Sequence, residues 1–499
     1  MQRIYIDIDA YLAHRASPAE GARMKRRQLY RATRKFKAFD GKVQSSEPAS
    51  YFPINKLPQD VLAEIFVFCL PNPELPKLNG SSSKHVAPLM LCNVCSSWRM
   101  LALSIPRLWQ QLFLAFADCM PKTREKDKAT ALTDAWLKRS GMLPLTLSLR
   151  ALGSLDGNME DLQAIIQAVL HTLVDHASRW EYFRLSWTLC PPILVPRLGH
   201  TPCLRTFILT TSRPNIAPFP FSSCPNLTDI FWPYACKISS SPNVPWHQLT
   251  CLRLGDTMPL SEMLLLLQAC PKLVELRIEV DDSADGALPR KTVITNCSLQ
   301  KLHLTVYDKC ESLLKRLTLP ALTDFSLDMD DGFAWLYGVH KQLLRFFSRS
   351  KCKLDRLQLR DCDFDGASLL RCLEHPSCAF LTELRIENIQ HSPMFTDTVL
   401  VALTDPVTGE YDVLLPYLKH LSLEACLAGS PGMLGMMILS RCLLWEKEDQ
   451  LNHVKVIYEE IHERDYLLIK LAEEQGLSTR FVFACDPYYS DSEATDEYY

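Results

Sequence analysis

One six-residue pattern, repeated ten times between residues 180 and 423, constrains this chain more than any other feature. Each copy begins with a large apolar residue, followed by two variable residues, an apolar residue, a variable residue and a further apolar residue. Alternation with a period of two is typical of a strand with one buried face. Successive copies start 22 to 37 residues apart, which leaves room for a return segment after each strand. The copies start at Trp180, Leu204, Leu227, Leu249, Leu273, Leu299, Leu322, Leu354, Leu381 and Leu418.

The segments between these strands complete a repeating unit. Several strands are preceded by proline, as at Pro202 and Pro271, and proline favours extended chain before it. The longer intervals predict return helices over residues 259–269, 341–347 and 367–373. The whole pattern resembles leucine-rich repeats. That resemblance implies an α/β fold, an irregular solenoid with parallel strands inside and helices or loops outside. No unit can bury its leucine face alone, so the stack is expected to be cooperative.

Residues 51 to 114, before the repeats, have the pattern of short helices. Pro58 stands where the first turn of a helix tolerates proline. Apolar residues at helical spacing follow it until Pro71, and a second helical stretch, rich in Leu and Cys, leads to a stop at Pro106. The residues that define the pattern are Leu57, Pro58, Val61, Leu62, Ile65, Phe66, Val94, Cys95, Trp98, Arg99, Pro106, Arg107, Leu108 and Trp109.

This arrangement resembles an F-box, the module that binds the Skp adaptor of a cullin-RING ubiquitin ligase, and it is most similar to F-box-like proteins abundant in mushroom-forming fungi. The chain departs from the family in an insertion at residues 71–87. A plain helical cap closing the solenoid is the alternative, because any cap needs an apolar stripe. The resemblance implies an adaptor-binding surface made of Leu57, Pro58, Val61, Leu62, Ile65, Val94, Cys95, Trp98 and Trp109.

The strand residues between the buried ones are expected to face the inner surface of the solenoid. The fourth position after each start carries mainly basic or apolar side chains. Exposed apolar residues beside charges suit a protein ligand better than nucleic acid, with ordinary solvent-facing residues as the alternative. The predicted substrate-binding residues are Arg184, Ile208, Phe231, Arg253, Arg277, Gln358 and Arg385.

The remaining segments complete the predicted organisation. Residues 1–48 form a basic helix or arm, interpreted as a solvated helix, a nuclear-import signal or a phosphate-contacting arm. The acidic residues 486–499 are expected to be disordered. The predicted domains are 1–48, the F-box-like domain 49–120, a linker helix 121–142, the repeats with a C-terminal cap 143–485, and the tail 486–499.

Composition narrows the class of protein. The 499 residues have a net charge of −3, so no global field favours nucleic acid. The 19 cysteines are scattered in apolar runs, as in a reduced intracellular protein. No secretory signal follows Met1 and no run is long enough to span a membrane. The expected location is therefore the cytoplasm, the nucleus or both.

No motif for catalysis or cofactor binding is present. The sequence lacks a glycine-rich phosphate loop, a GxSxG elbow and an HExxH pair. Cys92 and Cys95 form a CxxC without a second ligand pair, so packing is the better interpretation than zinc. We therefore expect no catalytic residue, no cofactor and no metal.

Together these features predict a substrate-recognition subunit of an SCF-type ubiquitin ligase. The F-box would bind the Skp adaptor, and through it a cullin, while the repeats would bind an unknown target protein. One alternative is a ligase-independent repeat scaffold. The other is a nuclear protein that contacts nucleic acid through its basic arm, although nucleic acid is the less favoured partner.

Overall fold

The computed structural model shows a mixed α/β protein built on one long parallel sheet. The structure describes residues 57–71, 86–117, 123–152, 159–188, 198–211, 221–233, 244–281, 293–307, 310–329, 339–362, 364–388, 394–404, 413–443, 450–458, 462–474 and 476–483. The chain divides into a unit of residues 1–64 and a unit of residues 65–499. The predicted basic arm 1–48, the tail 486–499 and most of the insertion 71–87 lie outside the described residues.

The sheet belongs to the unit of residues 65–499 and has 14 strands, which follow one another in chain order. Every neighbouring pair is parallel. The strands are β1 (Gln111–Ala117), β2 (Leu145–Leu152), β3 (Trp180–Thr188), β5 (Thr206–Thr211), β7 (Asp229–Trp232), β8 (Cys251–Pro259), β9 (Glu275–Asp281), β11 (Lys301–Val306), β13 (Asp324–Asp328), β14 (Arg356–Arg360), β15 (Glu383–Glu387), β17 (His420–Glu424), β19 (His453–Tyr458) and β20 (Ser478–Phe483).

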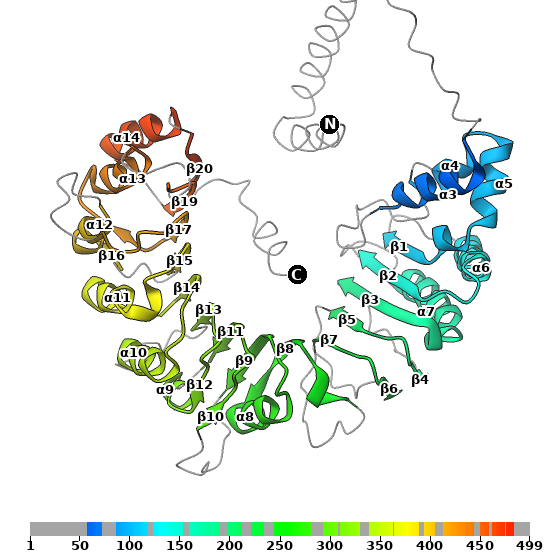
Figure 1. Ribbon diagram of the computed structural model, residues 1–499, viewed down its shortest axis with the longest axis horizontal. Coiled ribbons are helices and arrows are strands. Elements are labelled where there is room, and N and C mark those ends of the chain that lie inside the picture. Colours follow the sequence, from blue (N-terminus) through cyan, green and yellow to red (C-terminus); the bar gives the residue numbers. More distant parts are fainter. Residues whose placement is uncertain are drawn as a thin grey trace, which may run out of the picture. The chain divides into compact units, whose positions relative to one another are not determined.

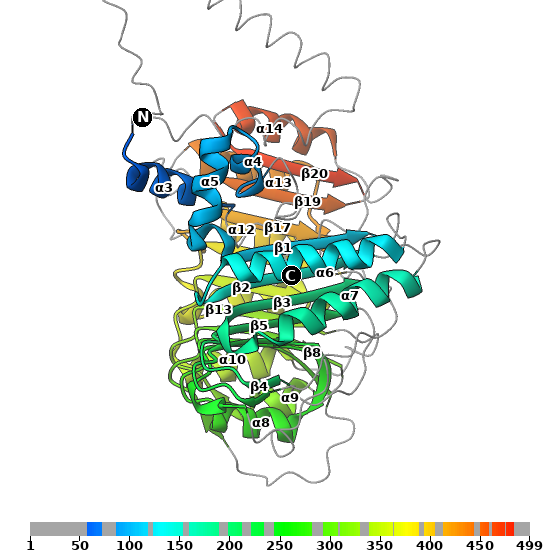
Figure 2. The ribbon, with the colours of Figure 1, turned by 90° about the vertical axis from the view of Figure 1, so that its right-hand side faces the viewer.

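Helices return the chain from one strand to the next along the outer face of this sheet (Figure 1). Figure 2 shows α6 and α7 lying along β1 to β3. Short parallel pairs, β4 (Leu198–His200) with β6 (Phe221–Ser223), β10 (Ile294–Thr295) with β12 (Leu317–Thr318), and β16 (Phe395–Thr396) with β18 (Leu427–Ala428), replace or accompany helices. The α-helices are α3 (Gln59–Phe68), α4 (Leu89–Cys92), α5 (Ser96–Ser104), α6 (Thr123–Arg139), α7 (Met159–Val174), α8 (Leu260–Ala269), α9 (Cys310–Leu314), α10 (Val339–Ser350), α11 (Gly366–Leu373), α12 (Asp397–Leu403), α13 (Met433–Leu443) and α14 (Glu463–Glu474), and the 3₁₀ turns are η2 (Pro106–Trp109), η3 (Ala177–Arg179), η5 (Trp246–Gln248) and η6 (Pro376–Cys378).

The core lies between the sheet and its outer helices, and the repeated apolar residues form it. None of the three apolar positions in any of the ten copies is more than 3% exposed. Equivalent positions pair directly in neighbouring strands, as Leu276 with Leu302 and Leu302 with Phe325. Each buried leucine contributes roughly 1.5–3 kcal/mol relative to an exposed one, and the stacking makes one continuous core. The predicted helices 259–269, 341–347 and 367–373 are present as α8, α10 and α11.

The predicted boundary at residue 143 is wrong, because the sheet begins earlier. β1 pairs in parallel with β2 along its whole length, so the segment assigned to the end of the F-box-like domain supplies the first strand. The helix predicted as a linker is α6, and it packs into the core. Trp136 of α6 is fully buried, meets Trp109 edge to face with ring centroids 4.7 Å apart, and donates a hydrogen bond to the Gln111 carbonyl.

Two arginines, one buried and one half-buried, join successive repeats in a way the sequence did not indicate. Arg441 of α13 is 2% exposed, and its Nε donates to the carbonyl of Leu403, the last residue of α12, at 2.6 Å. It also donates to the carbonyls of Leu414 and Leu415. Arg349 of α10 makes the same kind of contact with the Leu314 carbonyl at the end of α9. Carbonyls at a helix C-terminus have no partner within the helix, so each arginine supplies one.

Candidate functional site

The predicted substrate-binding residues form one column across the inner face of the sheet. Register pairs Arg184 with Ile208, Ile208 with Phe231, Phe231 with Arg253, and Arg253 with Arg277. Each is half-buried, between fully buried neighbours in the strand. Because the helices cover the other face (Figure 1), these side chains point to the open inner side. Gln358 and Arg385 pair with each other farther along the same column.

The column is longer than the sequence pattern indicated. Ser148 pairs with Arg184 on the N-terminal side, and Lys455 and Arg480 extend the column on the C-terminal side. β2, β19 and β20 lack the full leucine pattern, so their inner positions were missed. Aligning their apolar alternation with the repeats would have found them.

The central column carries no carboxylate among its described positions, whereas the columns beside it do. Glu275 and Glu383 lie on one side, and Glu279 and Glu387 on the other. Several of these acids pair across strands. One of these ion pairs joins an Arg253 terminal nitrogen to Glu275 at 2.7 Å. On the inner face, a central column whose charged side chains are basic therefore lies between two columns whose charged side chains are mainly acidic.

Two hollows open on this face. The first, of about 290 Å³, spans β3 to β11 and combines Ile208, Phe231 and Leu254 with Arg184. The second, of about 340 Å³, continues toward β15 and is lined mainly by charged and polar side chains. Arg253 and Arg277 line both hollows, which joins the two into one track across the sheet.

Comparison with known proteins does not identify the chain. No family model and no curated protein matches it. Within the described ranges, no three His, Cys, Asp or Glu side chains gather as a metal site requires. No helix in the same ranges is both long and apolar enough to cross a bilayer.

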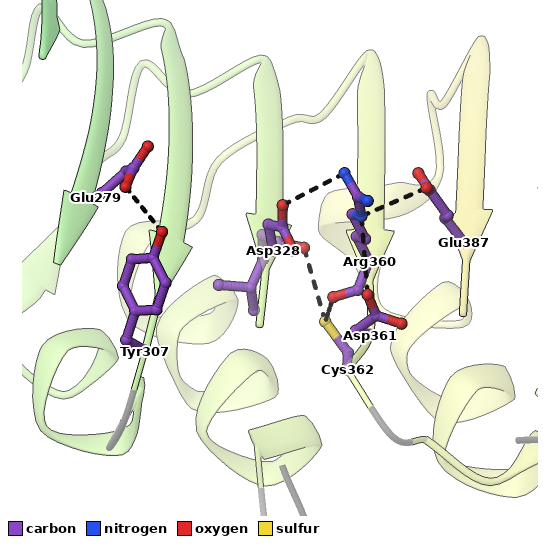
Figure 3. A network of polar contacts seen from close by, with 8 residues as sticks. Glu279, Tyr307, Asp328, Arg360, Asp361, Cys362 and Glu387 are labelled. Carbon is purple, nitrogen blue, oxygen red and sulfur yellow. Dashed lines mark hydrogen bonds and ion pairs between the residues drawn. The ribbon is translucent and has the colours of Figure 1, made fainter. Parts of the chain in front are cut away.

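A polar network lies at β13 to β15, in the flanking column that contains Glu387 (Figure 3). Arg360 lies between Asp328 at 3.8 Å and Glu387 at 3.3 Å, and its Nε also reaches Asp361 at 3.7 Å. Burial, followed by repulsion from Glu424, raises the pKa of Glu387 to about 7 in spite of the attraction of Arg360. Between pH 4.5 and about 7, the folded protein therefore holds a proton on Glu387 that the unfolded chain releases.

This raised pKa predicts that Glu387 weakens the fold at high pH. Its contribution is favourable below the ordinary carboxyl pKa near 4.5 and is lost as pH rises through about 7. Glu387→Gln should therefore raise the free energy of unfolding by up to about 3 kcal/mol at pH 8 and by less than about 1 kcal/mol at pH 5. Urea denaturation of both proteins at the two pH values measures the difference.

A matched control is Glu383→Gln, which removes only a partly exposed ion pair with Arg356. Such a pair is worth under about 1 kcal/mol. A Glu387→Gln protein that loses stability at pH 8 would show that the Arg360 contact outweighs burial and repulsion.

The predicted adaptor-binding residues divide into exposed and buried sets. Val61, Ile65 and Val94 are exposed by 43%, 37% and 55%. Pro58 and Cys95 are also exposed, and Leu57 and Trp98 are half-buried. The Trp98 ring packs on Phe66 with centroids 4.8 Å apart, a contact within the unit of residues 65–499.

Two of the predicted adaptor-binding residues are core residues instead. Trp109 is 1% exposed, donates from Nε1 to the Ala102 carbonyl at 2.9 Å, and lies under the Arg139 guanidinium. Leu62 is 8% exposed. Apolar helical spacing marks both kinds of position alike, because it does not distinguish a core face from a docking face. Cys95, expected to pack, instead caps α5, accepting a hydrogen bond from the Trp98 amide.

Proposed function

We propose that this chain is a substrate-recognition subunit of an SCF-type ubiquitin ligase. In this proposal α3 to α5 act as an F-box that binds the Skp adaptor, the sheet is that of a leucine-rich-repeat solenoid, and its inner face binds the target. The chain supplies binding, and transfer chemistry belongs to other subunits of the ligase.

The observation that supports adaptor binding most directly is the apolar surface of the short helices. Exposed apolar side chains stand on α3, α4, α5 and the turn between α4 and α5 within the unit of residues 65–499, and the Phe66–Trp98 contact joins the end of α3 in this unit to α5. So many exposed apolar side chains within one short stretch of the chain favour an interaction site. A purely structural cap would bury them. They are Ile65, Phe68, Met90, Val94, Met100 and Leu103, with exposures of 37% to 84%.

Binding of purified Skp adaptor tests the proposal. Val94→Asp places a charge in the exposed apolar surface, and we expect it to weaken adaptor binding about 30-fold, as loss of an interface hot spot does. Isothermal titration with the full chain measures this change. Leu471→Asp on α14 is the matched control, because Leu471 is 49% exposed and lies on the last helix of the described residues.

Two outcomes would contradict the proposal in different ways. A wild-type chain that does not bind the adaptor would favour the ligase-independent scaffold. Equal weakening by Val94→Asp and Leu471→Asp would show that binding does not involve α3 to α5. In both cases the inner face of the sheet would remain available to a protein ligand.

A further inference from the structure

The first hollow of the inner face exists because the sheet is irregular there. β7 is short and is followed by Pro233, and the register of β8 against β9 shifts between Arg253 and Thr257. Gly255, in the shifted segment, approaches Pro233 so closely that an added Cβ would lie 3.2 Å from the Pro233 Cα. Bulges of this kind commonly occur beside binding sites. The irregularity opens about 290 Å³ between β3 and β11.

The balance of basic and acidic side chains on the inner face changes at this hollow. On β1, β2, β3 and β5, the inner-face positions of the described strands include Arg150 and Arg184 and no Asp or Glu. Arg184 forms no ion pair with any described carboxylate. Among the same residues its buried Nε has no hydrogen-bond partner, and neither has the Thr210 hydroxyl. Both side chains line the hollow, so a ligand that enters it meets uncompensated donors.

The acids that line the same hollow already have partners. Asp229 accepts hydrogen bonds from the hydroxyls of Thr206 at 3.3 Å, Thr228 at 2.9 Å and Thr250 at 3.2 Å. Glu279 accepts one from Tyr307 at 2.8 Å (Figure 3). These contacts tie the carboxylates to side chains of neighbouring strands. Among the described residues that line the hollow, Arg184 is left as a cation without a fixed counter-charge.

Apolar surface lies directly beside this cation. Ile208 is the register partner of Arg184, and Phe231 is the register partner of Ile208. Both are half-buried on the inner face and line the hollow. A ligand that fills the site must therefore carry a negative group next to an apolar group. The carboxylates on both sides of the central column disfavour a polyanion such as nucleic acid.

We propose that this hollow binds the target protein through an acidic linear segment in which an Asp or Glu lies next to an aromatic or aliphatic residue. The segment's carboxylate contacts Arg184 and the Thr210 hydroxyl, and its apolar side chain packs on Ile208 and Phe231. The second hollow, which shares Arg253 and Arg277, receives the continuation of the segment. The inference rests on the proposed function, to which it adds the chemical class of the target.

Selection from a random heptapeptide display library on the immobilised full chain tests this inference. We expect the enriched peptides to carry Asp or Glu beside Phe, Tyr, Trp, Leu or Ile. A synthetic copy of the most enriched peptide should bind Arg184→Gln about tenfold more weakly than wild type, because a charge-assisted contact is lost. Its amide counterpart, with Asn and Gln in place of Asp and Glu, should lose affinity by a similar factor.

Arg480→Gln provides the matched control, because Arg480 is an exposed arginine of the same column on the last strand. It should leave peptide binding unchanged. The inference is overturned if no acidic peptides are enriched, if Arg184→Gln binds the peptide as wild type does, or if Arg480→Gln weakens binding equally. Phosphorylated peptides that bind where carboxylate peptides do not would also overturn it.

A further experiment tests whether the chain's own acidic tail competes for the hollow. A full chain in which Asp486, Asp491, Glu493, Asp496 and Glu497 are amides should bind the peptide as wild type does. Binding seen only in that variant would assign the hollow to the tail and overturn a target segment. Failure of these peptide experiments leaves adaptor binding intact, so it is distinguishable from failure of the proposed function.

Discussion

Replacing Trp109 with alanine is expected to lower the free energy of unfolding by about 4 kcal/mol, within the range for deleting a buried tryptophan ring. Trp109 packs edge to face on Trp136, carries the Arg139 guanidinium 4.8 Å from its ring, and donates to the Ala102 carbonyl. Its removal leaves a cavity at the junction of α5, α6 and β1. Urea denaturation followed by circular dichroism, with amide exchange along β1 and β2, measures the loss.

Met100→Ala is the control for this experiment, because Met100 lies on α5 but is 68% exposed. It should change stability by less than about 0.5 kcal/mol. Trp109→Ala should also lose adaptor binding, but only in proportion to the unfolded fraction. A Trp109→Ala protein that keeps full stability and yet fails to bind the adaptor would show that Trp109 contacts the adaptor directly.

The strands of the sheet could be predicted because a period of two assigns each residue to a face. Once Leu252 and Leu254 were placed in the core, Arg253 had to point to the other side, and the structure places it there. The same reasoning located Ile208 and Phe231 beside arginines in the central column. The first hollow was not predictable, because it depends on a register shift in β8 that no local pattern marks.

The helical segment was less predictable because its residues are apolar on more than one face. Val94 and Trp109 satisfy the same motif, yet one is 55% exposed and the other 1%. The difference arises from Trp136, 27 residues beyond Trp109, whose helix resembled a polar linker in its first half. Packing between such distant segments decides which apolar residues remain on the surface.

The arginines that join neighbouring repeats could not be predicted either, because their partners are also distant in the sequence. An arginine near the end of an amphipathic helix is ordinarily interpreted as a solvated residue or as a charge that complements the helix dipole. Arg441 is instead 2% exposed. Its partners are Leu403, Leu414 and Leu415, and these carbonyls come together with it only when two units stack.

Because of these buried hydrogen bonds, Arg441→Met is the second substitution for which we expect a large loss of stability. Methionine fills a similar volume but removes the guanidinium donors from the Leu403 and Leu414 carbonyls, while the Leu415 carbonyl keeps only its bond from the Leu418 amide. Each hydrogen bond to a charged group contributes roughly 1.5–3 kcal/mol, and an unsatisfied buried acceptor costs about 1–3 kcal/mol. Because the guanidinium's own burial cost disappears as well, we expect a net loss of about 4 kcal/mol. Since stability in a stack is transmitted through neighbour interfaces, the loss should fall mainly on α12, α13 and the strands that follow.

Amide exchange resolved by strand separates this outcome from general destabilisation. In Arg441→Met, protection should fall along β17 and β19 and remain unchanged along β2 and β3. Arg464→Met is the control, because Arg464 is an exposed arginine on α14, and it should leave protection unchanged throughout. Arg441→Lys should recover part of the loss, since an ammonium can reach fewer carbonyls than the planar guanidinium does. Equal stability of Arg441→Met and wild type would show that apolar packing alone joins these units, and that the buried hydrogen bonds only offset the guanidinium's desolvation.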